Sequence, residues 1–150
     1  MMEILNLIMK ETDIRDPMLI STSKVTATLM SIINSQATTQ GFLVSGYPRS
    51  MRDTKEYLET VGRLDGVILL NWTEKTLQTQ IEYGAKFGQV VYDVAKLELA
   101  NFRQHVLPVA EYFDYKHLLY VIPGERKPEN VYTDFVSVFK KILSSNHKAN

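Results

Sequence analysis

Three short apolar segments, separated by stretches with helical periodicity, constrain the fold more than any other feature of this 150-residue sequence. They cover residues 42–45, 67–70 and 118–122. Each has the length of a strand, and the second is continuously apolar, as in a strand covered on both faces. Strands that alternate with helices form βαβ units, in which the strands run parallel. The sequence therefore predicts an α/β fold with a mainly parallel sheet.

Apolar residues spaced three or four apart predict the helices of the first half. Ile4, Leu5 and Ile8 mark a short first helix. The second follows three potential N-cap residues, Ser21, Thr22 and Ser23. Its apolar stripe consists of Val25, Leu29, Ile32 and Ile33. A polar helix over residues 51–61 is expected to end at Gly62.

Three further helices are predicted in the second half. Thr73 is expected to cap a helix that runs to about Tyr83 and stops at Gly84. The next, longer helix is expected to turn five apolar side chains inward: Val94, Leu97, Phe102, Val109 and Phe113. The last begins near Pro128, a residue suited to a first turn. It is expected to bury Val131, Phe135, Val138, Phe139 and Ile142. Residues 144–150 are predicted to form a flexible tail.

Composition excludes several classes of function. Seventeen basic and seventeen acidic side chains cancel, so no overall charge attracts nucleic acid or an anionic membrane. No apolar run approaches the roughly 20 residues of a membrane span, and the start does not resemble a secretory signal. Without cysteine there are no disulfides or thiolate metal sites, and His105 and His117 lack partners at ligand spacing. We therefore expect a cytoplasmic domain that holds no metal or cofactor.

Residues 41–50 read Gly-Phe-Leu-Val-Ser-Gly-Tyr-Pro-Arg-Ser, a short strand followed by a tight turn that presents Arg49. This run resembles the adenylate kinase family, whose pattern is Gly-Phe-Leu-(Ile/Val)-Asp-Gly-Tyr-Pro-Arg and whose arginine holds the phosphate of bound AMP. The resemblance implies a three-layer α/β/α fold of the P-loop nucleoside kinase type. It also implies that Gly46, Tyr47 and Arg49 contact a nucleotide, although weakly.

The resemblance covers nearly the whole chain. Residues 67–71 look like the family's next core strand, and residues 108–112 are similar to its Pro-Val-Ile-x-Tyr segment. By this alignment residues 1–143 form an adenylate kinase-like domain. Within it, residues 1–35 correspond to the helices on the AMP side, and residues 84–93 are a remnant of the lid.

The chain departs from the family's pattern where the family does its chemistry. The phosphate loop, Gly-x-x-x-x-Gly-Lys-(Ser/Thr), is absent from the 150 residues, so the resemblance implies a domain truncated at its N-terminus. The family's metal-organising aspartate is Ser45, and its adenine-reading glutamine is Asp53. Tyr83, Gln89 and Glu98 stand where the family has arginines. Phosphoryl transfer needs such cations, so these changes predict a loss of catalysis.

Arg49 allows two interpretations. It is either a residual contact to the phosphate of AMP or a surface arginine that closes the turn with a nearby acid. The missing phosphate-loop strand raises a second question, because in the family it lies between the strands at residues 42–45 and 67–70. Those strands either pair directly, or accept a segment of another chain, or belong to half of a longer polypeptide.

Three functions follow from these alternatives. The favoured one is a non-catalytic adenylate kinase-like module with a structural or regulatory binding role, whose partner is a protein segment that completes the sheet. The second is a nucleoside monophosphate kinase that uses Mg-ATP and AMP, with its phosphate loop supplied by another segment. The third is a domain that senses AMP weakly through Arg49.

Overall fold

The computed structural model describes residues 10, 16–36, 38–39 and 41–146. The short helix predicted at residues 4–8 lies outside the described residues. The described residues form two compact units. Unit 1 consists of those up to Arg63 together with residues 101–109, and unit 2 consists of residues 64–100 with those from Ala110 onward.

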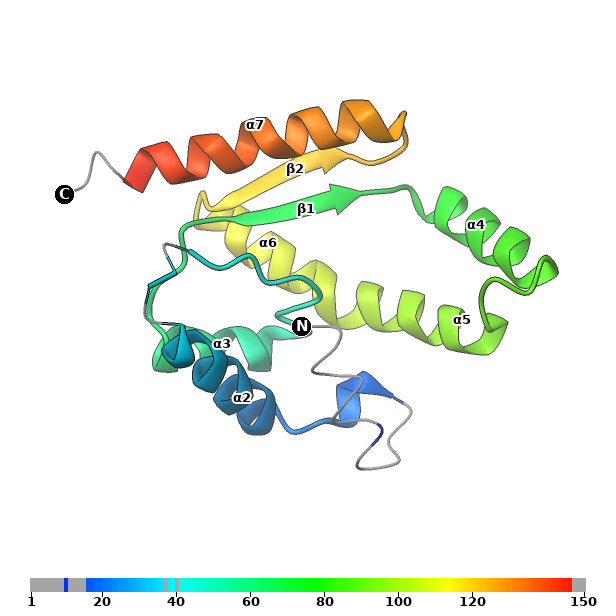
Figure 1. Cartoon of the computed structure of the whole chain (residues 1–150). Coiled ribbons are helices and arrows are strands. Elements are labelled where there is room, and N and C mark those ends of the chain that lie inside the picture. Colours follow the sequence, from blue (N-terminus) through cyan, green and yellow to red (C-terminus); the bar gives the residue numbers. More distant parts are fainter. Residues whose placement is uncertain (1–9, 11–15, 37, 40, 147–150) are drawn as a thin grey trace. The chain divides into compact units, whose positions relative to one another are not determined.

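A parallel pair of strands forms the sheet of unit 2 (Figure 1). Strand β1 (Val67–Asn71) pairs with β2 (Leu119–Pro123), in a register that joins Val67 to Leu119 and Asn71 to Pro123. Both strands lie within one residue of their predicted positions. The crossover between them is helical, as the alternation of strands and helices predicts. The combination of helices with a short parallel sheet is compatible with a nucleotide kinase α/β fold.

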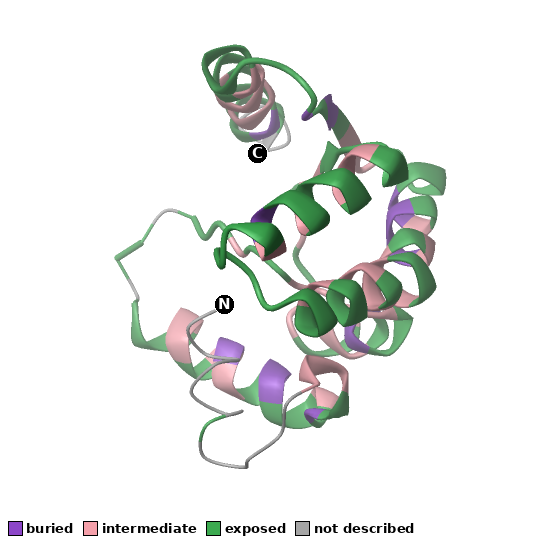
Figure 2. Ribbon diagram, turned by 90° about the vertical axis from the view of Figure 1, so that its right-hand side faces the viewer, coloured by how far each residue is buried: buried purple, intermediate pink, exposed green. Residues whose placement is uncertain are grey.

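Helix α7 (Pro128–Asn146) packs against β2. The contact is close at Gly66, where an added Cβ would lie 2.8 Å from Cδ1 of Ile142 and 3.3 Å from the ring of Tyr120. Ile122 and Ile142 are both buried. The remaining predicted core positions of α7 are only half-buried, as can be followed in Figure 2. The helix continues through Asn146, so the first residues of the predicted tail are helical.

Helix α4 (Glu74–Lys86) begins as predicted, because the Thr73 hydroxyl accepts a hydrogen bond from the backbone N–H of Thr76. The predicted stop at Gly84 is wrong. Gly84 is buried inside the helix, where the side chain of Val90 takes the space that a Cβ would occupy. The chain instead turns at Gly88, whose φ of 67° suits glycine.

The long predicted helix exists, but in three parts. These are α5 (Tyr92–Asn101), a π-helical turn η2 (Phe102–Val106) and α6 (Leu107–Tyr115). The π turn ends two residues before Pro108, which has no N–H to donate to the preceding turn. Val109 and Phe113 are buried as expected. The inward orientation expected for Val94 and Leu97 is wrong, because they are 50% and 40% exposed and α5 buries none of its residues.

Unit 1 is built on α2 (Thr22–Ser35) packed against α3 (Met51–Thr60). Helix α2 buries Val25 and Leu29, which are one turn apart on one face. Ser21 stands at its N-cap, although its hydroxyl contacts Ser23 and not a backbone N–H. A 3-10 turn, η1 (Pro17–Leu19), precedes α2. Helix α3 ends as predicted, with Gly62 at φ 69°.

The strand predicted at residues 42–45 is absent from the described structure, in which the sheet contains only β1 and β2. These residues are irregular, and Phe42 and Leu43 are 42% and 64% exposed. An extended apolar segment becomes a strand only when another backbone pairs with it. Among the described residues β1 pairs with β2 alone, so direct pairing of residues 42–45 with β1 is also wrong.

Candidate functional site

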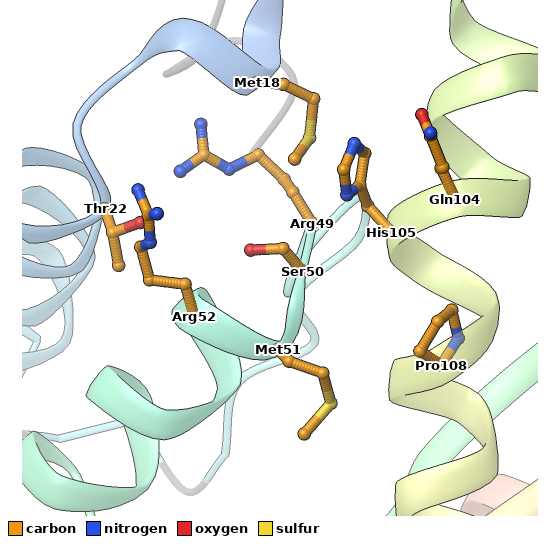
Figure 3. A pocket seen from close by; sticks show the side chains of 9 residues that line it. All are labelled: Met18, Thr22, Arg49, Ser50, Met51, Arg52, Gln104, His105 and Pro108. Carbon is orange, nitrogen blue, oxygen red and sulfur yellow. The ribbon is translucent and has the colours of Figure 1, made fainter.

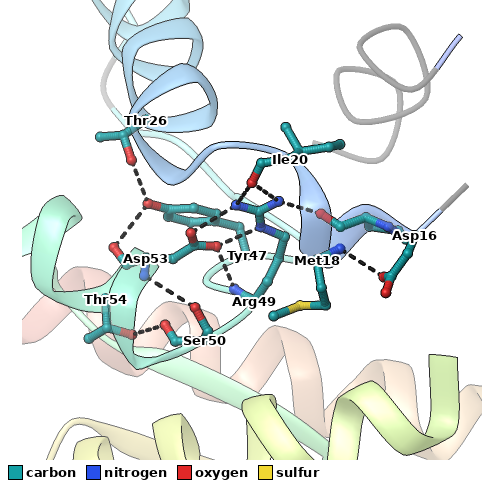
Figure 4. Close-up of polar contacts among 10 residues, drawn as sticks. Asp16, Met18, Ile20, Thr26, Tyr47, Arg49, Ser50, Asp53 and Thr54 are labelled. Atoms are coloured by element: carbon teal, nitrogen blue, oxygen red, sulfur yellow. Dashed lines mark hydrogen bonds and ion pairs between the residues drawn. The ribbon is translucent and has the colours of Figure 1, made fainter. Parts of the chain in front are cut away.

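The turn that carries Arg49 connects an irregular segment to the start of α3 (Figure 4). Gly46 has φ 71°, a left-handed conformation that glycine adopts without strain, and the Tyr47–Pro48 peptide bond is cis. Ser50 is the N-cap of α3, and its hydroxyl accepts a hydrogen bond from the backbone N–H of Asp53. Arg49 and Asp53 are therefore one turn apart at the beginning of the helix.

Arg49 and Asp53 form a buried, two-pronged ion pair. Nε of Arg49 lies 2.7 Å from Oδ2 of Asp53, and Nη2 lies 2.9 Å from Oδ1. The backbone N–H of Arg49 also donates to Oδ2, at 3.0 Å. Arg49 is 6% exposed and Asp53 is fully buried. The structure thus shows the expected pairing of Arg49 with a nearby acid, but the pair is buried and not on the surface.

Backbone carbonyls accept hydrogen bonds from the remaining N–H groups of the Arg49 guanidinium. Nη1 donates to the carbonyl oxygens of Pro17, at 2.6 Å, and Ile20, at 3.3 Å, and Nη2 also reaches the latter at 3.3 Å. A guanidinium has five N–H donors in a fixed fork. The contacts to one carboxylate and two carbonyls account for all of them. A phosphate could bind this arginine only by displacing partners that are already in place.

Tyr47 extends the cluster to α2. Its hydroxyl donates to the backbone carbonyl of Asp53 at 3.2 Å and lies 3.1 Å from Oγ1 of the buried Thr26. The ring meets that of Tyr57 edge-on, with centroids 6.0 Å apart. Burial raises the pKa of the Tyr47 hydroxyl above its ordinary value of 10.0, and the nearby Asp53 carboxylate adds to the rise. We refer to Thr26, Tyr47, Arg49 and Asp53 as the arginine cluster.

The electrostatics of the arginine cluster are self-contained. Asp53 lies in the first turn of α3, where the helix dipole favours a negative charge. Its carboxylate neutralises Arg49 in a place from which water is excluded. Breaking such a pair by removing one partner leaves a bare buried charge and costs about 3–5 kcal/mol. The cluster therefore holds the turn, η1 and the two helices of unit 1 together.

A hollow of about 550 Å³ lies beside the cluster in unit 1 (Figure 3). It is lined by Met18, Thr22, Arg49, Ser50, Met51, Arg52, Gln104, His105 and Pro108. The side chain of Arg52 makes no hydrogen bond or ion pair with any described residue, and His105 is half-buried. Arg52 and Gln104 were not predicted from the sequence, and the signal that could have indicated Arg52 was its place in the first turn of α3.

The other predicted positions are not members of the arginine cluster. Tyr83, Gln89 and Glu98 belong to unit 2 and are exposed. Ser45 belongs to unit 1 and is exposed. Within the part of the chain that the structure describes, no three His, Cys, Asp or Glu side chains lie close enough to hold a metal ion. No described helix combines the length and apolar character of a membrane span.

Comparison with known proteins connects the chain to adenylate kinases. No family model matches it. It is 25% identical to human adenylate kinase isoenzyme 5 over 116 residues, which cover 75% of this chain and 21% of that protein. The bovine isoenzyme 5 is also 25% identical, over 117 residues and with the same coverage. The adenylate kinase of Halobacterium salinarum is 27% identical over 124 residues, covering 63% of this chain and 57% of the relative.

The chain thus spans about a fifth of the length of the mammalian relatives and somewhat more than half of the archaeal one. These identities are low, but they extend over most of the chain. They support an adenylate kinase-like relationship and a kinase-like domain.

Proposed function

We propose that this chain is a non-catalytic adenylate kinase-like module with a structural or regulatory binding role. The observation that carries the proposal is the state of Arg49, whose five donors are engaged by Asp53 and by the carbonyls of Pro17 and Ile20. Phosphoryl transfer depends on cations that are free to neutralise phosphate charge. A buried arginine paired with its own carboxylate does not supply such a cation.

The sequence adds support from unit 2. Tyr83, Gln89 and Glu98 replace arginines of the family pattern, and Glu98 would repel a phosphate. The cytoplasmic location expected from composition remains a prediction, as does the absence of a cofactor. Mg-ATP and AMP become ligands only under the enzyme alternative.

The partner in this proposal is a protein segment that completes the sheet of a three-layer α/β/α fold. Two-stranded sheets are marginally stable by themselves, and within the described residues β1 has a strand neighbour on one edge only. Leu70 and Val121 are central strand residues, yet they are 49% and 52% exposed. Strand addition would pair the open edge, and a partner that also packs on a face of the sheet would cover such side chains.

A coupled assay with ATP and AMP tests the catalytic part of the proposal. We expect no turnover above the protein-free blank. Turnover by the wild-type protein overturns this part. In that case Arg49→Lys, which keeps the charge but not the two-pronged fork, shows whether Arg49 carries the activity. Lys55→Ala, an exposed change on α3, is the matched control.

A second candidate, weak AMP sensing, is favoured by the hollow next to the arginine cluster. Arg52 lines this hollow and lacks a partner among the described residues, and His105 lines it as well. Calorimetric titration with AMP tests this candidate. Heat that is present in the wild type and in Lys55→Ala but lost in Arg52→Ala would support sensing. No heat at millimolar AMP eliminates it.

A further inference from the structure

Exposed apolar side chains gather at the end of the α4–α5 hairpin in unit 2. Six large apolar side chains lie there between the last turn of α4 and the middle of α5: Tyr83, Phe87, Val90, Val91, Val94 and Leu97. They are between 40% and 69% exposed. The rings of Tyr83 and Phe87 are in contact, with centroids 4.6 Å apart. We refer to these six residues as the hairpin tip.

Helix α5 depends on a cover that the described residues do not provide. Six of its ten residues are apolar, from Tyr92 to Ala100, and none is buried. Most helical stability in proteins comes from packing of an apolar face, and α5 buries none of its own residues among those described. The arginine cluster differs from α5 in this respect, because even its charged side chains are buried and paired. The hairpin tip is therefore an incomplete contact.

The size of the hairpin tip fits one protein interface. A whole aromatic side chain offers about 150–250 Å², and an aliphatic one roughly 60–120 Å² at 25 cal/mol per Å². Scaled by the exposed fractions, the six residues present roughly 300–540 Å² of apolar surface. A standard interface takes about 800 Å² from each partner, of which about 450 Å² is apolar. The tip is large enough for such a contact.

The charges around the tip indicate the kind of partner. The exposed charged residues on these two helices near the tip are Glu82, Lys86, Asp93, Lys96 and Glu98. Both signs are mixed, and the whole chain has no formal net charge. Such a rim does not select a nucleic acid, an anionic membrane or a strongly charged protein. A second copy brings the same mixed rim, and a two-fold axis can set lysines of one copy opposite carboxylates of the other.

We propose that the hairpin tip is the contact surface of a homodimer in which two copies of this chain bury their tips against each other. The contact uses helix side chains and involves neither Arg49 nor the open edge of β1. The proposal therefore stands or falls separately from the proposed non-catalytic function and from strand addition.

Sedimentation velocity between about 0.1 and 100 µM tests the proposal, since interfaces of this size have affinities from micromolar downward. We expect a concentration-dependent dimer for the wild type and at least tenfold weaker association for Val91→Asp. Tyr132→Asp is the matched control, because Tyr132 on α7 has the same exposure of 69% as Val91. A wild-type monomer at all concentrations overturns the proposal, as does an equal loss in both variants.

A second measurement protects the test against a variant that does not fold. The chain has no cysteine, so a single introduced thiol gives an unambiguous crosslink. Val91→Cys should form a disulfide-linked dimer under mild oxidation, at protein concentrations where Tyr132→Cys does not. Equal crosslinking of the two variants contradicts a contact at the tip. Binding of the wild type to zwitterionic vesicles that is lost in Val91→Asp would also overturn the homodimer, in favour of a lipid surface.

Discussion

The arginine cluster of unit 1 and the hairpin tip of unit 2 distribute polarity in opposite ways. In the cluster, a full ion pair is buried, and every donor of Arg49 has an acceptor. At the tip, large apolar side chains such as Phe87 and Val91 are more than half exposed. Buried polar groups are tolerated when they are fully paired, whereas an exposed apolar patch of several hundred Å² often serves as a contact surface. The first region is satisfied by the chain itself, and the second is the surface at which we propose a contact.

The largest expected effect comes from breaking the cluster. Arg49→Ala leaves the carboxylate of Asp53 buried without its cation, so we expect a loss of about 3–5 kcal/mol in unfolding free energy. Urea denaturation followed by circular dichroism measures it. The double variant Arg49→Ala with Asp53→Ala should lose much less than the sum of the two single changes. Additive losses, or a loss below about 1 kcal/mol for Arg49→Ala, would show that the pair is not a buried unit.

The next largest loss of stability is expected in unit 2, where the indole of Trp72 lies close to the backbone of Gly124. A Cβ at Gly124 would lie 1.9 Å from Nε1 of Trp72, so Gly124→Ala must displace the indole. We expect a loss of about 1–3 kcal/mol. Because Trp72 is the sole tryptophan in the sequence, its fluorescence reports the displacement directly. Gly41→Ala is the control, since a Cβ there meets no atom within 4 Å. An unchanged emission spectrum in Gly124→Ala would contradict the contact.

Tyr47 should make the stability of the cluster depend on alkaline pH. Its folded-state pKa is raised above the ordinary value of 10.0, so the folded protein holds the hydroxyl proton more tightly than the unfolded chain. This stabilisation is fully present below about pH 10 and is lost as pH rises through the folded-state pKa. Tyr47→Phe should cost about 1 kcal/mol at neutral pH, from the lost hydrogen bonds.

The measurement is the urea midpoint of both proteins between neutral pH and pH values above the ordinary pKa of tyrosine. The stability difference between wild type and Tyr47→Phe should shrink across that range. A difference that stays constant with pH would mean that the hydroxyl titrates equally in both states.

The smallest expected effect is that of Val94→Ala, which we contrast with the same change at Val109, a valine that the sequence places on the same helical face. Val109→Ala removes two buried methyl groups and should cost roughly 1.5 kcal/mol. Val94→Ala, at a 50% exposed position, should change stability by less than about 0.5 kcal/mol at a concentration where the protein is monomeric. Both changes gain the same helix propensity, so the comparison isolates burial. Equal losses would mean that Val94 is covered within the monomer.

Local signals predicted much of the fold. The continuous apolar runs at β1 and β2 and the cap at Thr73 predicted their elements closely, as did the glycine after α3. These features depend on residues that are neighbours in the chain. The prediction that α4 stops at Gly84 was wrong because it used local propensity alone. The place of Gly84 inside α4 follows from its contact with the side chain of Val90.

The sequence indicated which residues belong to the candidate site, but not that Arg49 is buried and fully paired. The turn sequence indicated Arg49, and its family resemblance indicated a phosphate. Asp53 drew attention only as a departure from that pattern, although its spacing of four residues from Arg49 was a signal for an ion pair. The carbonyls of Pro17 and Ile20 could not be anticipated, since they lie 32 and 29 residues away in the chain.

The sequence by itself therefore determined the periodicity of the helices, the two parallel strands, the turn at Gly46 and the relation to adenylate kinases. Tertiary structure alone decided which groups are buried together. It turned Arg49 inward onto Asp53, left residues 42–45 without a strand partner among the described residues, and left Val94 exposed. The physical reason is that propensity and capping act between chain neighbours, whereas burial and pairing depend on surfaces that only the folded chain brings into contact.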